Sequence, residues 1–283
     1  MMRRVITAAI TIPMFLVMYI FSSSIVLNIA AAIITLIALY EIFVTTKYVN
    51  NPELLVISLI FGGAMPFVLK FQLIEVASKM NLIQPIVFVF IVLLFIMLLV
   101  NNKRYKIEEI SVVFLLSSIV SLSFSCTVFV RQEIVFGEIL FLLIFTGAWM
   151  SDTGGYIVGR LFGKHKLLPA ISPKKTIEGL VGSFVFNIIT FLGISFICPL
   201  LYHPEGKTIE FNVFVMVLLG VLSVILGLIG DLAASAIKRQ FNVKDFGNIL
   251  PGHGGIMDRF DSVLFIAPMF YIVSQFFDIV VSV

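Results

Sequence analysis

The residues best suited to chemistry gather between Ser235 and Asp261, in a chain that is otherwise strongly apolar. The 283 residues are 60% hydrophobic and only 12% charged, and a charged group at the centre of a bilayer costs about 2.5 to 3.5 kcal/mol on insertion scales. This segment nevertheless holds four basic residues, three carboxylates and one histidine. Such a concentration of charge indicates a functional site.

The spacing of the carboxylates predicts a metal site. Asp258 and Asp261 lie three residues apart, on the first turns of a predicted helix, and two carboxylates so placed can ligate Mg²⁺ together with water and phosphate oxygens. Upstream, Asp231, Ser235 and Lys238 share one helix face if the preceding apolar helix continues through them. A carboxylate, a hydroxyl and an ammonium would then meet at that helix end.

The basic residues and glycines of the same segment favour phosphate binding. The turn Pro251-Gly252-His253-Gly254-Gly255 allows backbone N–H groups to approach an anion closely. The cations that would neutralise several phosphates, with Arg able to bind two oxygens at once, are Lys238, Arg239, Lys244 and Arg259. Metal, phosphates and a glycine turn together favour phosphoryl or nucleotidyl transfer.

Each of these features also has a purely structural interpretation. Asp258 and Asp261 could complement a helix macrodipole, His253 could satisfy a turn, and Lys238 could anchor the topology. The structural interpretation is weaker for Asp231, because a carboxylate that ends a long apolar run is usually paired or metal-bound. The combination favours chemistry.

The elements that position these residues are membrane helices. Roughly 20 apolar residues cross a hydrocarbon core about 30 Å thick, and continuous rather than alternating runs favour helices over a barrel. The sequence therefore predicts an all-α polytopic membrane protein with about nine transmembrane helices and two polar cytoplasmic loops, 151–177 and 231–261. The predicted spans are 5–21, 25–44, 54–71, 82–100, 109–130, 134–151, 178–200, 211–230 and 260–281.

The distribution of Lys and Arg predicts the orientation. With the N-terminus cytoplasmic, the basic residues left outside are only Lys70, Lys79, Arg131 and Lys207 of the 19 in the chain. This asymmetry follows the positive-inside rule and places both polar loops at the cytoplasmic face of the cell (inner) membrane. We expect residues 1–130 to provide scaffold, lipid or oligomer contacts, and residues 131–283 to form the catalytic region.

The motif from Ser235 to Asp261 resembles the defining motif of the phosphatidate cytidylyltransferase family, also called CDP-diacylglycerol synthase. Its matching positions are Ser235, Lys238-Arg239, Lys244-Asp245, Gly247, Leu250-Pro251, His253-Gly254-Gly255, Asp258-Arg259 and Asp261. The first loop, from Ser151-Asp152 to Glu178-Gly179, is similar to the family's other common stretch, and Tyr40-Glu41 fits weakly. Residues 1–130 otherwise resemble the family only in hydropathy.

The resemblance implies a reaction in which CTP and phosphatidic acid give CDP-diacylglycerol and pyrophosphate with Mg²⁺ as cofactor. The catalytic residues would be Lys238, Arg239, Lys244, Asp245, His253 and Arg259. Substrate would be bound by Ser235, Gly254, Gly255, Asp152, Ser172, Lys174, Lys175 and Thr176, and the metal by Asp231, Asp258 and Asp261. The partners would be these two substrates and the bilayer; we expect no nucleic acid, and the apolar helices allow a homodimer.

Three alternatives remain open at this point. A related enzyme would join CTP to another membrane lipid phosphate. A transporter would use Asp231 and Glu41 to bind coupling ions, although no inverted repeat is visible. In the first loop, Gly159 and Gly163 could serve close helix packing while Ser172-Pro173 caps a helix.

Overall fold

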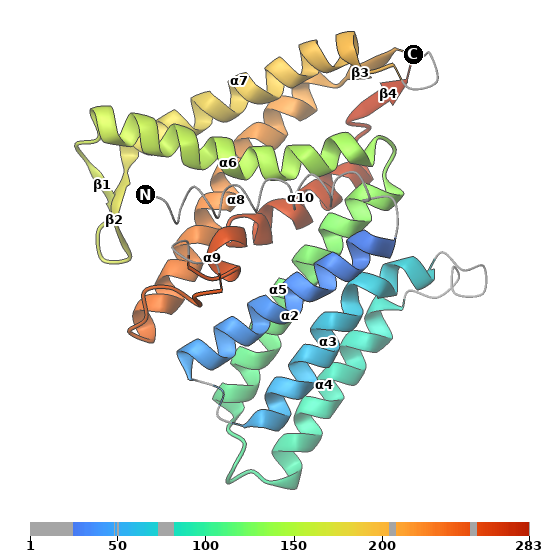
Figure 1. The fold of residues 1–283 in the computed structure, drawn as a ribbon, viewed down its shortest axis with the longest axis vertical. Coiled ribbons are helices and arrows are strands. Elements are labelled where there is room, and N and C mark those ends of the chain that lie inside the picture. Colours follow the sequence, from blue (N-terminus) through green and yellow to red (C-terminus); the bar gives the residue numbers. More distant parts are fainter. Residues whose placement is uncertain are drawn as a thin grey trace. The chain divides into compact units, whose positions relative to one another are not determined.

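The computed structural model describes residues 25–47, 49, 51–72, 82–203, 208–249 and 254–282. Over these residues the chain forms nine helices and two small antiparallel sheets (Figure 1). Five helices are long and apolar enough to cross a membrane, namely α2 (Ile25–Thr46), α4 (Ile83–Val100), α5 (Ile107–Glu133), α7 (Ile177–Leu201) and α8 (Val213–Gln240). Together with the apolar stretches of α3 (Pro52–Gln72) and α10 (Val263–Phe276), they confirm the all-α polytopic class. The predicted span 5–21 lies outside the described residues.

Three of the other predicted spans differ from the structure, one of them being 211–230, because helix α8 continues to Gln240. The span 134–151 is helix α6 (Gly137–Phe162), which continues through the first half of the predicted loop 151–177. The span 260–281 was wrong in extent, because the short helix α9 (Met257–Phe260) and a turn precede α10, which ends at Phe276. Beyond α10, β4 (Val280–Ser282) pairs with β3 (Ile209–Phe211).

The chain divides into two compact units. The first joins the described residues up to Phe129 with Gln240–Phe260, and the second joins Val130–Arg239 with the described residues from Asp261. The first break falls beside the boundary expected at residue 130, yet the charged segment 240–260 belongs with the N-terminal helices. The functional roles expected for residues 1–130 and 131–283 remain predictions.

The first unit is built on α2, α3, α4 and α5. Helix α2 packs along α3, α3 along α4, and α2 also contacts α9. Phe61 and Phe90 stack with their ring centroids 4.0 Å apart, and the Asn28 amide donates to the Pro66 carbonyl at 2.7 Å. Pro66 lies inside helix α3, so this hydrogen bond joins α2 to α3.

The second unit is dominated by the pair α6 and α7, which pack together along much of their length. The hairpin that joins them consists of β1 (Lys166–Leu168) and β2 (Ser172–Thr176). Helix α10 also contacts α6. The polar stretches that the sequence marked as reactive are thus carried on helix ends, the hairpin and the segment 240–260.

Candidate active site

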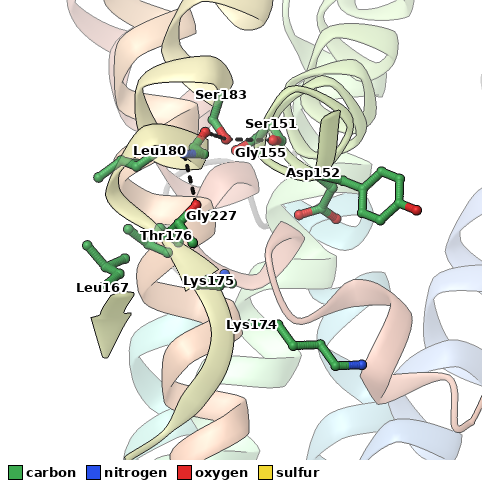
Figure 2. A pocket seen from close by; sticks show the side chains of 13 residues that line it. Ser151, Asp152, Gly155, Leu167, Lys174, Lys175, Thr176, Leu180, Ser183 and Gly227 are labelled. Carbon is green, nitrogen blue, oxygen red and sulfur yellow. Dashed lines mark hydrogen bonds between the residues drawn. The ribbon is translucent and has the colours of Figure 1, made fainter. Parts of the chain in front are cut away.

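A cavity of about 310 Å³ lies in the second unit, among α6, the β1–β2 hairpin, α7 and α8. Figure 2 shows Asp152 on α6 and Lys175 and Thr176 on β2 among the residues around it. Its polar lining consists mainly of Ser151, Asp152, Lys174, Lys175, Thr176 and Ser183. The structure therefore brings together four of the five first-loop residues predicted to bind substrate; among the described residues that line the cavity, Ser172 is not included.

The hairpin holds the two lysines on a short, tethered strand. Lys166 of β1 stands opposite Thr176 of β2, and Leu168 opposite Ser172. Thr176 then caps helix α7, since its Oγ1 accepts from the Gly179 amide at 3.1 Å. This hydroxyl satisfies one of the N–H groups left unpaired at a helix start. The alternative in which Ser172-Pro173 caps a helix was wrong, because both residues lie in β2.

Glycines on α6 and α7 bring the two helices into close contact behind the cavity. A Cβ on Gly154 would lie 2.6 Å from the Gly182 carbonyl oxygen, and one on Gly179 would lie 2.7 Å from that of Gly155. Small residues that allow backbones to approach in this way are typical of membrane helix pairs. The packing interpretation also holds for Gly159, whose added Cβ would be 2.9 Å from Thr176 Oγ1.

The carboxylate of Asp231 is paired within the same unit. Its Oδ2 forms an ion pair with Lys175 Nζ, and its Oδ1 accepts from the Ser235 hydroxyl at 3.3 Å. Helix α8 continues to Gln240, so Asp231, Ser235 and the buried Lys238 do share one helix face, as the spacing required. Lys175 links this helix end to the cavity.

Asp261 lies in the turn between α9 and α10, and its surroundings disfavour the ionised form. Burial above all, together with the negative charges of Asp231 and Asp152, raises the pKa of Asp261 to about 7, against a lowering by the Ser262 amide and by Lys238. The Ser262 amide donates to Asp261 Oδ1 at 2.8 Å. Three carboxylates are therefore close enough to repel one another.

This concentration of negative charge fits a divalent cation. Within the described ranges, no three His, Cys, Asp or Glu side chains lie close enough together to hold a metal ion by themselves. One or two carboxylates, with water and substrate phosphate completing the shell, is the mode that Mg²⁺ prefers. Asp231 and Asp261 offer such a donor set.

Apart from Arg239 at the end of α8, the remaining predicted residues lie in the segment 240–260 of the first unit. Asp258 Oδ2 accepts from the Phe246 amide at 2.8 Å and from the Gly255 amide at 3.1 Å, so this carboxylate ties together the two sides of the turn. Gly254 adopts a φ of +85°, a conformation that favours glycine. Lys244, Asp245, Arg239 and Arg259 are exposed, and His253 lies outside the described residues.

The importance of one acidic residue was missed by the sequence reasoning. Glu41 of α2 is buried, with 3% of its surface exposed, and its Oε2 accepts from the Met257 amide at 3.0 Å. Thr45, one turn later, donates to the Phe246 carbonyl. A lone carboxylate inside a 22-residue apolar helix was the available signal, because such groups are costly in a membrane segment.

Fold and site together define a helical membrane protein with a cavity that is lined by Lys174, Lys175 and Asp152. The sequence pattern of the Cytidylyltransferase family matches residues 2–277. The chain belongs to this family, and it is an enzyme of the nucleotidyltransferase class.

Similar proteins cover nearly the whole chain. The phosphatidate cytidylyltransferase of Staphylococcus aureus (strain COL) is 37% identical over 275 residues, which are 94% of this chain and 96% of that protein. The phosphatidate cytidylyltransferase of Staphylococcus epidermidis (strain ATCC 12228) is 34% identical over 271 residues, with the same coverage. The resemblance noted from the Ser235 to Asp261 motif is thereby confirmed.

Proposed function

We propose that this protein transfers CMP from CTP to phosphatidic acid, giving CDP-diacylglycerol and pyrophosphate for phospholipid biosynthesis. Membership of the cytidylyltransferase family and the similarity to phosphatidate cytidylyltransferases support this substrate pair. The observation that carries the proposal is the cavity, in which Lys174 and Lys175 lie with Asp152 and one lysine pairs with Asp231. Cations for phosphate and carboxylates for a metal are thus adjacent in an otherwise apolar molecule.

The reaction needs positioning and charge neutralisation more than proton transfer. A phosphate oxygen of phosphatidic acid, already anionic, attacks the α-phosphorus of CTP in line. The new P–O bond forms as the bond from the α-phosphorus to the bridging oxygen breaks, and the electron pair leaves with pyrophosphate. Catalysis of this kind rests on orienting the reactants and stabilising negative charge in the transition state. No covalent enzyme intermediate is required.

The basic residues supply that charge from two sources. In the second unit, Lys174, Lys175 and Lys238 contribute ammonium groups, and Thr176 and Ser235 contribute hydroxyls; Arg239 extends the basic end of α8. In the first unit, Lys244, Arg259 and the backbone of Gly254 are the groups that the sequence motif assigns to phosphate, whereas the Gly255 amide already donates to Asp258 Oδ2. Asp245 and His253 complete the set as orienting residues.

Lys175 changes partner when substrate binds. In the structure its ammonium pairs with Asp231. A phosphate group entering the cavity attracts Lys175, and the released Asp231 becomes available to a cation. Until the substrate binds, Lys175 and Asp231 therefore neutralise each other's charge.

Mg²⁺ is the cofactor we propose, held by Asp231, Asp261 and Asp258. A divalent cation held there would supply positive charge that offsets the charge of the leaving pyrophosphate. Asp231 and Asp261 would be its donors in the second unit, and Asp258 of the first unit is a metal ligand that the sequence motif predicts.

The site faces the cytoplasm in this proposal, because CTP is a cytosolic solute and the diacyl chains remain in the bilayer. The positive-inside rule supports this orientation and a cell (inner) membrane location. A homodimer in that membrane remains an expectation.

Purified protein in detergent, incubated with labelled CTP, Mg²⁺ and phosphatidic acid, tests the proposal directly. We expect CDP-diacylglycerol and pyrophosphate in equal amounts. A parallel reaction with a polyprenyl phosphate in place of phosphatidic acid should yield no nucleotide-linked lipid. Transfer to the polyprenyl phosphate alone would reassign the acceptor, and no transfer by intact protein to either lipid would refute the proposal.

A further inference from the structure

Glu41 presents a carboxylate where the N-terminal helices meet the glycine-rich segment. Its side chain is buried in α2, and only one of its two oxygens is used in hydrogen bonding. Oε2 accepts from the Met257 amide at 3.0 Å, whereas Oε1 has no hydrogen-bond partner among the described residues. Keeping a buried carboxylate in an apolar helix is costly, so its place calls for a function.

The two glycines that border the turn converge on this carboxylate. A Cβ on Gly247 would lie 2.5 Å from Glu41 Cδ, and a Cβ on Gly255 would lie 2.7 Å from the same atom. Real Cβ atoms essentially never approach another heavy atom within 3.0 Å. A side chain at either position would therefore displace the Glu41 carboxylate, and the backbone of both glycines lies close against it.

Further contacts fix the same two sides of the turn. Thr45, one helical turn after Glu41, donates to the Phe246 carbonyl. Asp258 Oδ2 accepts from the amides of Phe246 and Gly255 together. Phe246 is thus bound by both Thr45 and Asp258, Gly255 is bound by Asp258, and the Glu41 carboxylate lies next to Gly247 and Gly255.

We propose that Glu41 is a positioning residue: it sets the spacing of Gly247 and Gly255 and thereby positions Lys244, Gly254 and Arg259 for the phosphates of CTP. The inference rests on the proposed function, which assigns these three residues to phosphate binding, and it identifies that phosphate as the nucleotide's. Glu41 contacts no substrate and acts through the backbone that it supports.

Steady-state kinetics of Glu41→Ala and Glu41→Gln provide the first test. Glu41→Ala should raise the KM for CTP about tenfold or more while the KM for phosphatidic acid changes less than about twofold, because weakened binding of one substrate appears in its own KM. Glu41→Gln keeps an acceptor for the Met257 amide and nearly the same volume, so it should retain most of the activity.

The matched control is Thr35→Val in the same helix. Thr35 is fully buried, and its hydroxyl donates to the Ala31 carbonyl of its own helix at 2.8 Å, so the substitution removes a buried polar group without touching the turn. Its kinetic constants should match the wild type. Equal losses in Thr35→Val and Glu41→Ala, or equal rises in both KM values for Glu41→Ala, would show a general packing role and overturn the proposal.

A double-mutant cycle with Gly255→Ala provides the second test. The single variant Gly255→Ala should lose most activity, because its methyl group collides with the Glu41 carboxylate. In Glu41→Ala/Gly255→Ala the methyl group has room, so the double variant should be no less active than Glu41→Ala alone. A double variant whose loss equals the product of the two single losses would overturn the proposal.

Two readouts separate this inference from the proposed function. If the intact wild type forms no CDP-lipid, the proposed function fails. If the wild type is active and Glu41→Ala has wild-type kinetics, only the positioning role fails. Monodisperse elution of every variant in detergent establishes that folding is intact.

Discussion

Replacement of Lys175 by alanine should impair catalysis far more than it impairs folding. Its ammonium lines the cavity and pairs with Asp231, and each side chain of the pair is 26% exposed. A partly exposed ion pair stabilises the fold by at most about 1 kcal/mol. A hydrogen bond from a charged donor to a phosphate is worth about 1.5 to 3 kcal/mol.

These magnitudes translate into different observables. With about 1.4 kcal/mol per factor of ten, loss of the phosphate contact lowers kcat/KM for CTP roughly 10- to 150-fold. Loss of the ion pair lowers the free energy of unfolding by less than about 1 kcal/mol. The assay is steady-state CDP-lipid formation in mixed micelles, with thermal unfolding in the same detergent measured in parallel.

The control for Lys175→Ala is Lys166→Ala in the partner strand of the hairpin. Lys166 is exposed and is not among the described residues that line the cavity, so its removal changes the net charge of the protein by the same amount. Its kcat/KM for CTP should stay within about twofold of the wild type, as expected for an exposed charge. Wild-type kinetics of Lys175→Ala, or equal losses in both variants, would refute the assignment of Lys175 to phosphate.

Three further predictions concern the acidic group and the helix pair. Asp261→Asn should abolish CTP incorporation into lipid while the protein stays folded and inserted; near-normal turnover of the purified variant would remove Asp261 from the metal site. Because the pKa of Asp261 is raised from 3.8 to about 7, the stability of the metal-free protein should fall as the pH rises between these values, and the apparent affinity for Mg²⁺ should rise over the same range. Thermal unfolding in buffers of different pH, with and without Mg²⁺, measures both effects. An unfolding temperature that does not change with pH would contradict the environment assigned to Asp261. Gly182→Ala should lower the unfolding free energy by about 1 to 3 kcal/mol through overpacking, since its Cβ would lie 2.5 Å from Val158 Cβ. In the same helix, Gly193→Ala meets nothing within 4 Å and should be neutral or stabilising.

Hydropathy predicted most of the helices, because membrane spans are governed by length and apolar content. The sequence also predicted that Asp231 of α8 has a partner, because a carboxylate at the end of an apolar run needs one. In the structure that partner is Lys175. The predicted partner was a cation or a metal, and only the structure identified a lysine from the other polar loop. Contacts between distant segments leave no periodic trace in one sequence.

The extension of α6 could not be predicted from local preference. Glycine disfavours helix by about 1 kcal/mol relative to alanine, so Gly154, Gly155 and Gly159 indicated a loop. Their tertiary contacts with α7 outweigh that preference, because each glycine allows a close backbone approach that a side chain would block. The hairpin was not predicted either, because its strands have only three and five residues. An alternating pattern cannot be recognised over so few positions.

The glycine contacts also bear on how the cavity performs chemistry. Phosphoryl and nucleotidyl transfer gain most from groups fixed in place before the substrate arrives. A lysine side chain has four rotatable bonds, so its ammonium group can occupy many positions. Here the backbone beneath Lys175 is a strand that ends in the Thr176 cap, and Ser183 donates to the Ser151 carbonyl at 2.6 Å across the α6–α7 contact. The helix that carries Asp152 and the strand that carries Lys175 are therefore joined through the α6–α7 contact, so that the proposed exchange of Asp231 for phosphate requires only the lysine side chain to move.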